Sequence, residues 1–173
     1  DIGAHRLLKI IEQIMALSQI EEKGLTLIFA PFDVTEFTLR LQDDFKNRFP
    51  ERKLTLTIGK EIQQVISDRD RLQQVLDYLI ENAVKYATPT SEIKLRIERR
   101  AEEILFSVVD DGPGIPEPHK EKVFDPFFRT QDETNMRSPG SGLGLTISKA
   151  IVEALGGRIW VEDEIPQGCR MRV

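Results

Sequence analysis

One segment limits the possible folds more than any other: a helical stretch from Asp70 to about Ala87 that is apolar along only one side. At about 100° per residue, its apolar side chains fall on a single face. They are Leu72, Val75, Leu76, Leu79, Ile80, Ala83 and Ala87. Ser67 and Asp70 resemble a capping box before this stretch, and Thr88-Pro89 closes it. Because a single apolar face must be buried, the segment predicts a helix packed on a sheet.

Helical and strand periodicities alternate along the rest of the chain. Helices are predicted over residues 4–22, 33–49 and 142–155, and strands over residues 25–30, 54–58, 93–97, 104–108, 159–161 and 169–173. A short polar segment joins the two central strands, which indicates a β-hairpin. Residues 110–141 are rich in proline and glycine. A connection of that length is usually functional or disordered.

The composition indicates one folded domain and excludes several kinds of partner. With 173 residues, 40% of them hydrophobic and 31% charged, the chain can bury one core. The net charge of −5 and the absence of a basic run argue against nucleic-acid binding. One cysteine, Cys169, and two distant histidines predict neither a disulfide nor a zinc site. No apolar run is long enough to span a membrane, so we expect a soluble, cytoplasmic domain without direct membrane contact, whose parent protein can still be membrane-anchored.

Polar side chains gather at one border of the apolar face of the 70–87 helix. Asn82 and Lys85 lie together there. Tyr78 is four residues before Asn82, and Tyr86 lies between this group and the core. An amide and an ammonium anchored beside a cleft can bind a polyanion and its metal ion. Taken alone, this helix is more typical of a solvated flank.

Two glycine-rich segments lie at the ends of the long connection. Asp110-Asp111-Gly112-Pro113-Gly114-Ile115 follows a strand, so its carboxylate can accept a hydrogen bond from an amino group while the glycines let backbone approach a flat ring. Asp-Gly alone is more typical of a solvated turn. Gly140-Ser141-Gly142-Leu143-Gly144-Leu145 opens a helix, whose N-terminal N–H groups attract phosphate. The segment lacks the Gly-Lys-Ser/Thr ending of a P-loop, and no strand directly precedes it as in a dinucleotide fingerprint.

Four segments, taken in order, resemble the N, G1, F and G2 boxes of sensor histidine kinases of two-component systems, members of the GHKL superfamily. They are Asn82 with Lys85-Tyr86, Asp110-x-Gly112-x-Gly114, Phe124-x-x-Phe127-Phe128-Arg129 and Gly140-x-Gly142-Leu143-Gly144-Leu145. The resemblance covers most of the chain. It implies an α/β two-layer sandwich of the Bergerat type, with a mixed sheet and helices on one face, preceded by one projecting helix. Residues 1–23 would be part of the second helix of a dimerisation hairpin, and residues 24–173 the catalytic ATP-binding domain.

The resemblance also implies a role for each matched residue. Asn82 would coordinate Mg²⁺ and Lys85 would reach a phosphate of ATP, so these two are the expected catalytic residues. Tyr86 would lie by the nucleoside, and Asp110 would accept from the adenine amino group. The other expected ATP contacts are Gly112, Gly114, Ile115, Phe124, Phe128, Arg129, Gly140, Ser141, Gly142, Leu143, Gly144 and Leu145. Residues 129–141 would form a lid over ATP, hinged by the phenylalanines of the F box, which also suit a hydrophobic core.

Two departures from the family pattern are present. The family usually has an asparagine four residues before its metal-binding asparagine, where this chain has Tyr78. No histidine is followed by the acidic residue and the Arg-x-Pro-Leu pattern of the phosphoacceptor helix, since Arg6 follows His5 and His119 lies in a loop. The phosphoacceptor helix is therefore expected upstream of this chain.

The expected function is phosphoryl transfer from Mg²⁺-ATP to a histidine on that helix, with the Asp of a response-regulator receiver domain as the next acceptor. The full-length protein is expected to be a homodimer, in which the domain meets its own hairpin or that of the second protomer. A hydrolysing ATPase of the superfamily is disfavoured, because such enzymes carry a glutamate where this chain has Tyr78, and Glu81 points away from the apolar stripe. A degenerate nucleotide-binding module that acts through protein contacts is the other alternative.

Overall fold

The computed structural model describes residues 2–129, 141–164 and 168–173. In chain order the elements are α1 (Ile2–Lys23), β1 (Ala30–Asp33), α2 (Val34–Arg48), β2 (Lys53–Ile58), β3 (Gln64–Ser67), α3 (Arg69–Tyr86), β4 (Glu92–Arg100), β5 (Glu103–Asp110), the 3-10 turns η1 (Glu117–His119) and η2 (Lys122–Phe124), α5 (Gly144–Ala154), β6 (Trp160–Asp163) and β7 (Cys169–Arg172).

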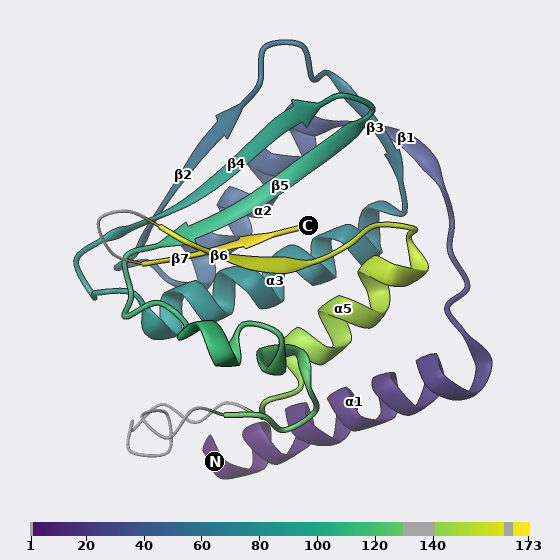
Figure 1. Cartoon of the computed structure of the whole chain (residues 1–173), viewed down its shortest axis with the longest axis vertical. Helices are drawn as coiled ribbons and strands as arrows, with labels where there is room; N and C mark the ends of the chain where they lie inside the picture. The colour runs from purple at the N-terminus through teal and green to yellow at the C-terminus, as the bar shows by residue number, and fades with distance from the viewer. Residues whose placement is uncertain (1, 130–140, 165–167) are drawn as a thin grey trace.

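The main sheet has five strands in the order β2-β4-β5-β7-β6 (Figure 1). β2 and β4 run parallel and the other neighbours run antiparallel, so the sheet is mixed. α2 packs on β2, α3 packs on β4 and β5, and α5 packs beside α3. The two-layer sandwich predicted from the sequence is confirmed, with the helices on one face of the sheet.

The core lies between α3 and the central strands. Ile93, Leu95 and Ile97 point inward from β4 and are at most 1% exposed. They meet the apolar face of α3, where Val75, Leu76 and Leu79 are equally buried. Burying one such side chain contributes about 1.5–3 kcal/mol, so the alternation of β4 and the single apolar face of α3 define this interface together.

Helix α1 is present as predicted, but it lies along α5 and does not stand clear of the domain (Figure 1). Its inward side chains Leu17 and Ile20 pack against the core. The helix ends at Gly24, whose N–H donates to the carbonyl oxygen of Ile20 at 3.1 Å and whose φ is +69°. On the opposite side five apolar side chains are 44–60% exposed: Leu7, Leu8, Ile11, Ile14 and Met15.

The strand predicted over residues 25–30 is wrong, because the ladder starts only at Ala30. β1 pairs antiparallel with β3, a short strand that the sequence did not reveal, from Ala30 opposite Ser67 to Asp33 opposite Gln64. A strand needs a hydrogen-bonded partner, and β3 offers four residues. The alternating pattern before Ala30 therefore forms no ladder.

Two helices begin at residues other than those predicted from the sequence. The N-cap of α3 is Asp68 in place of Ser67, and its carboxylate accepts from the N–H groups of Arg71 at 3.0 Å and Ile28 at 2.8 Å. α5 begins at Gly144 in place of Gly142, because Gly142 has a φ of +74° that a right-handed helix excludes. Across the described residues, no helix combines the length and apolar composition that crossing a bilayer requires.

Candidate functional site

Asp110 is the last residue of β5 and lies opposite Cys169, the first residue of β7. Its carboxylate accepts a hydrogen bond from the N–H of Gly112 at 2.8 Å and another from the N–H of Cys169. The pKa of Asp110 is raised to about 6, mainly by burial and also by the nearby Asp111, although these two hydrogen bonds act in the opposite direction. A half-buried carboxylate that folding makes costly to ionise is typical of a functional position.

The glycine segment after Asp110 touches the end of α3. A Cβ on Gly112 would lie 2.8 Å from the carbonyl oxygen of Tyr86, so only glycine allows this close approach. Asp111 holds the segment from the other side, because its carboxylate accepts from the Ser91 hydroxyl at 2.6 Å and from the Thr88 N–H at 3.1 Å. Two further predicted ATP contacts, Gly114 and Ile115, come next in the chain. Gly114 has a φ of +77°, in the left-handed region, and Ile115 packs against the core.

Asn82, Lys85 and Tyr86 are partly exposed on α3. The ammonium of Lys85 donates to the Tyr86 hydroxyl and lies 4.4 Å from the centre of the Tyr86 ring. Tyr86 therefore links two of the predicted segments, since its backbone meets Gly112 and its side chain holds Lys85.

The second glycine segment reaches α3 at its middle. A Cβ on Gly144 would lie 3.2 Å from the Tyr78 ring, so the first turn of α5 lies against Tyr78. No side chain caps the N-terminus of α5. The Leu143 N–H donates to the Ser141 hydroxyl at 3.2 Å, and Leu143 itself is fully buried. Leu145, in the first turn of α5, is partly buried against the core.

The F-box residues pack at the base of this turn. Phe124 is 6% exposed, and Phe128 is partly buried with its ring 5.5 Å from that of His119. Phe127 is different, because its φ is +61° and its side chain is 61% exposed. Its N–H donates to the carbonyl oxygen of Gly142 at 3.1 Å, which joins the F box to the glycine turn. Arg129 is partly exposed, while Gly140 and most of the predicted lid lie outside the described residues.

Gly168 is a site residue that the sequence analysis missed. Its φ is +132°, and a Cβ there would lie 2.0 Å from the carbonyl oxygen of Asp110 and 3.0 Å from the Cα of Asp111. Its own carbonyl oxygen lies beneath Gly114, at 3.1 Å from where a Cβ of that residue would be. The available signal was a glycine directly before a predicted strand, which by itself marks only a turn.

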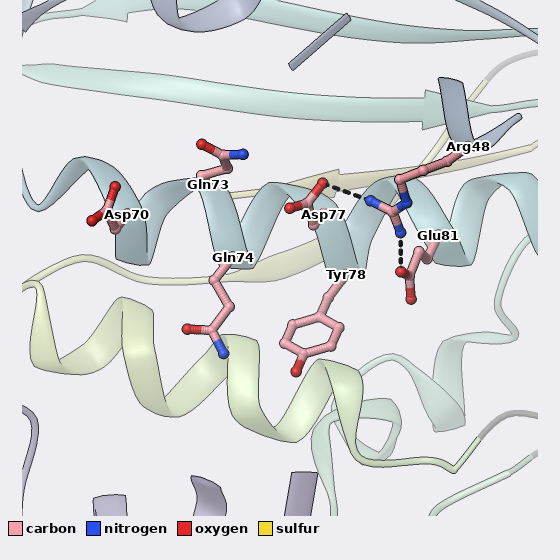
Figure 2. A pocket seen from close by; sticks show the side chains of 7 residues that line it. All are labelled: Arg48, Asp70, Gln73, Gln74, Asp77, Tyr78 and Glu81. Carbon is pink, nitrogen blue, oxygen red and sulfur yellow. Dashed lines mark hydrogen bonds and ion pairs between the residues drawn. The ribbon is translucent and has the colours of Figure 1, made fainter. Parts of the chain in front are cut away.

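The described surface also has a shallow depression of about 500 Å³ on the outer side of α3, lined by Arg48, Asp70, Gln73, Gln74, Asp77, Tyr78 and Glu81 (Figure 2). None of the predicted contact residues lines it. Arg48 pairs there with Asp77 at 3.1 Å and with Glu81. Figure 2 shows Tyr78 pointing away from these groups, toward α5.

The predicted segments therefore meet along one helix. Tyr86 contacts the Asp110 segment, Tyr78 contacts the start of α5, and Asn82 is one turn from each. This arrangement offers a buried carboxylate acceptor, bare glycine backbone, an ammonium, an amide oxygen and uncapped helix N–H groups. Together they suit a purine ring at one end and phosphates at the other. Among the described residues no three His, Cys, Asp or Glu side chains gather to hold a metal ion by themselves.

Known proteins resemble this chain in both sequence and fold. The family model of histidine kinase-, DNA gyrase B- and HSP90-like ATPases matches residues 67–173. The circadian input-output histidine kinase CikA of Synechococcus elongatus is 33% identical over 177 aligned residues, which cover 100% of this chain and 23% of CikA. This chain thus spans less than a quarter of that relative.

Two solved structures extend the likeness. Full-length ShkA in complex with AMPPNP has a similar fold, with a TM-score of 0.84 and 24% identity over 96% of this chain and 35% of ShkA. The histidine kinase ThkA in complex with the response regulator protein TrrA has a TM-score of 0.79 and 29% identity over 98% of this chain and 47% of ThkA. With Asp110, Asn82 and both glycine segments inside the matched range, the chain belongs to the family of histidine kinase-, DNA gyrase B- and HSP90-like ATPases.

Proposed function

We propose that this chain transfers the γ-phosphoryl group of Mg²⁺-ATP to a histidine on a helix upstream of residue 1. One observation carries the proposal: the Asp110 segment and the start of α5 both lie against α3, on either side of Asn82. In this proposal residues 1–23 belong to a dimerisation hairpin and residues 24–173 form the catalytic unit.

The adenine end of the site is assigned to the Asp110 segment. The carboxylate of Asp110 accepts from the adenine amino group, and Gly112 and Gly114 leave room for the flat ring. Tyr86 borders the nucleoside, with Ile115 as an apolar neighbour.

The phosphate end is assigned to Lys85 and the turn that opens α5. Lys85 supplies a positive charge, and the backbone N–H groups from Leu143 onward, with the helix dipole, attract phosphate oxygens. An imidazole nitrogen then attacks the γ-phosphorus in line, while the bond between this phosphorus and the leaving ADP oxygen breaks. In such a reaction the protein contributes mainly positioning and charge neutralisation. Phe124 and Phe128 support the turn from the F box. Arg129, which directly follows them, is assigned to the vicinity of the phosphates.

Asn82 is the proposed protein ligand of Mg²⁺. Its amide oxygen is the hard donor that Mg²⁺ prefers, and the phosphates and water complete the usual octahedral shell, so no carboxylate cluster is needed. When bound, the ion neutralises charge on the transferring phosphoryl group.

Hydrolysis of ATP is less consistent with this site. A water-activating carboxylate would have to replace Tyr78, whose ring packs on Gly144. Glu81 is paired with Arg48 on the outer side of α3 (Figure 2), away from α5. The site therefore favours transfer to an external imidazole over activation of water.

The partners follow from the same assignment. The exposed apolar side of α1 suits a second helix, so we propose a homodimer of the full-length protein. ThkA is a histidine kinase solved with a response regulator, and we propose such a regulator, through its aspartate, as the next acceptor. Because ATP is a substrate of the cell interior, the proposed location of the domain is the cytoplasm.

The test is transfer of labelled phosphate from Mg²⁺-ATP to the upstream hairpin of the parent protein, supplied in trans. We expect acid-labile, base-stable label, abolished by Asn82→Ala and by Asp110→Asn. Nucleotide binding without transfer would refute the kinase proposal and leave a binding module. Release of inorganic phosphate without a labelled hairpin would indicate the hydrolysing alternative.

A further inference from the structure

Gln13 is a buried polar side chain on an otherwise apolar side of α1. It is 6% exposed, and Leu17 and Ile20 continue the same side toward the core. A buried amide needs a hydrogen-bond partner to offset its lost hydration, whereas leucine at this position would need none. An amide at this place therefore suggests a role beyond packing.

The partner of Gln13 belongs to the phosphate turn. The Ser141 hydroxyl donates to the Oε1 atom of Gln13 at 2.6 Å, across 128 positions in the sequence. The same hydroxyl oxygen accepts from the N–H of Leu143 at 3.2 Å. One hydroxyl thus joins α1 to the residue directly before α5.

These two hydrogen bonds occupy donors that a phosphate group would use. A serine hydroxyl has one hydrogen, and here Gln13 takes it. The Leu143 N–H, which points from the N-terminal end of α5, is taken by Ser141. A phosphate oxygen can gain the hydroxyl hydrogen of Ser141 only when the contact with α1 is released.

We propose that Gln13 is a positioning residue through which α1 and a nucleotide phosphate compete for Ser141. The proposal rests on the nucleotide site proposed above and adds its regulation by α1. Binding equilibria that share a group are linked in both directions. Docked α1 therefore weakens nucleotide binding, and bound nucleotide loosens α1.

The experiment measures the Kd of a non-hydrolysable ATP analogue with Mg²⁺ by calorimetry, on the whole 173-residue chain. Gln13→Leu puts an apolar side chain of similar size in this place and removes the acceptor, so binding should tighten about fivefold, the ratio for one net hydrogen bond. Gln13→Glu keeps a stronger acceptor and should weaken binding by about the same factor. The matched control is Gln19→Leu, an exposed glutamine on the same helix, which should leave the Kd unchanged.

Two further measurements separate competition for Ser141 from a purely structural role of Gln13. In a Ser141→Ala background the change at Gln13 should have no effect on the Kd, because the shared hydroxyl is gone. The nucleotide analogue should also speed hydrogen exchange in α1 of the wild-type chain and leave it unchanged in Gln13→Leu. If Gln13→Leu does not fold cooperatively, Gln13→Asn, whose amide is one methylene too short to reach, replaces it.

The outcomes separate the two proposals. An unchanged Kd in the folded Gln13 variants, or the same shift with and without Ser141, overturns the competition while the nucleotide site stands. A wild-type chain that binds no nucleotide overturns the proposed function as well.

Discussion

Replacing Asp110 by asparagine is expected to stabilise the folded chain while it weakens nucleotide binding. The substitution keeps the shape of the side chain and an oxygen that can accept from Gly112, but removes the buried charge. Folding raises the pKa of this carboxyl from 3.8 to about 6, mainly through burial. The folded state therefore holds the proton more tightly than the unfolded state, and the charged form is the costly one.

The size of the effect follows from the two pKa values. The difference between 3.8 and about 6 corresponds to about 3 kcal/mol of stability lost when the carboxyl is fully ionised. Because the folded-state pKa is the higher one, stability rises as the pH falls from 8 through 6 and on toward the unfolded value. Between pH 8 and pH 5 about 1.4 kcal/mol of the loss is recovered. The advantage of Asp110→Asn should shrink by that amount.

The assay is denaturant unfolding of both proteins at several pH values from 5 to 8. Thermal unfolding should show the same trend. For a domain of this size, the Tm gain of Asp110→Asn over the wild-type chain should be about 3–6 °C smaller at pH 5 than at pH 8. Nucleotide binding is measured in parallel at pH 8, where loss of a charged acceptor should weaken the affinity about 10- to 100-fold. Wild-type affinity should itself fall as the pH drops through about 6.

Asp111→Asn is the matched control, because the neighbouring carboxyl has the opposite environment. The Ser91 hydroxyl holds the pKa of Asp111 below its usual value, so its stabilising effect is present above that value and lost only at lower pH. Asp111→Asn should therefore destabilise slightly, and equally at pH 5 and pH 8. A difference between wild type and Asp110→Asn that does not change with pH would refute the burial argument.

Two further substitutions test the support of the site. Gly168→Ala places a Cβ 2.0 Å from the carbonyl oxygen of Asp110, so we expect more than about 3 kcal/mol of lost stability in urea unfolding, together with weakened nucleotide binding. Asp68→Ala removes the α3 cap and the acceptor for Ile28, and should lower the free energy of unfolding by about 1–2 kcal/mol.

Each of these changes has its own control. Gly156→Ala also places alanine at a positive φ, +83°, but with nothing within 4 Å, so it should cost only about 1 kcal/mol and leave binding intact. Equal losses at Gly156 and Gly168 would contradict the role of the Asp110 contact. Asp68→Asn retains a capping oxygen and should lose less than Asp68→Ala; equal losses would show that the cap contributes nothing.

Local pattern was enough for most elements of the fold. The apolar face of α3 and the alternation of β4 were predicted from periodicity, since each reflects burial on one side. The motif segments were found the same way, from residue types at short spacings. Pairing could not be predicted locally, so β3 was missed and β1 was placed too early. Asp68 was overlooked as the cap of α3 because its neighbour Ser67 is an equally good capping residue.

By itself the sequence determined the periodic elements, the four motifs and the family, because these depend on residues close together in the chain. Only the tertiary structure decided what distant residues do to each other. Gly168 limits the position of Asp110, Tyr78 lies against Gly144, and α1 reaches the phosphate turn. The physical reason is that van der Waals contact and desolvation act through space, so it is mainly burial on folding that raises the pKa of Asp110 to about 6.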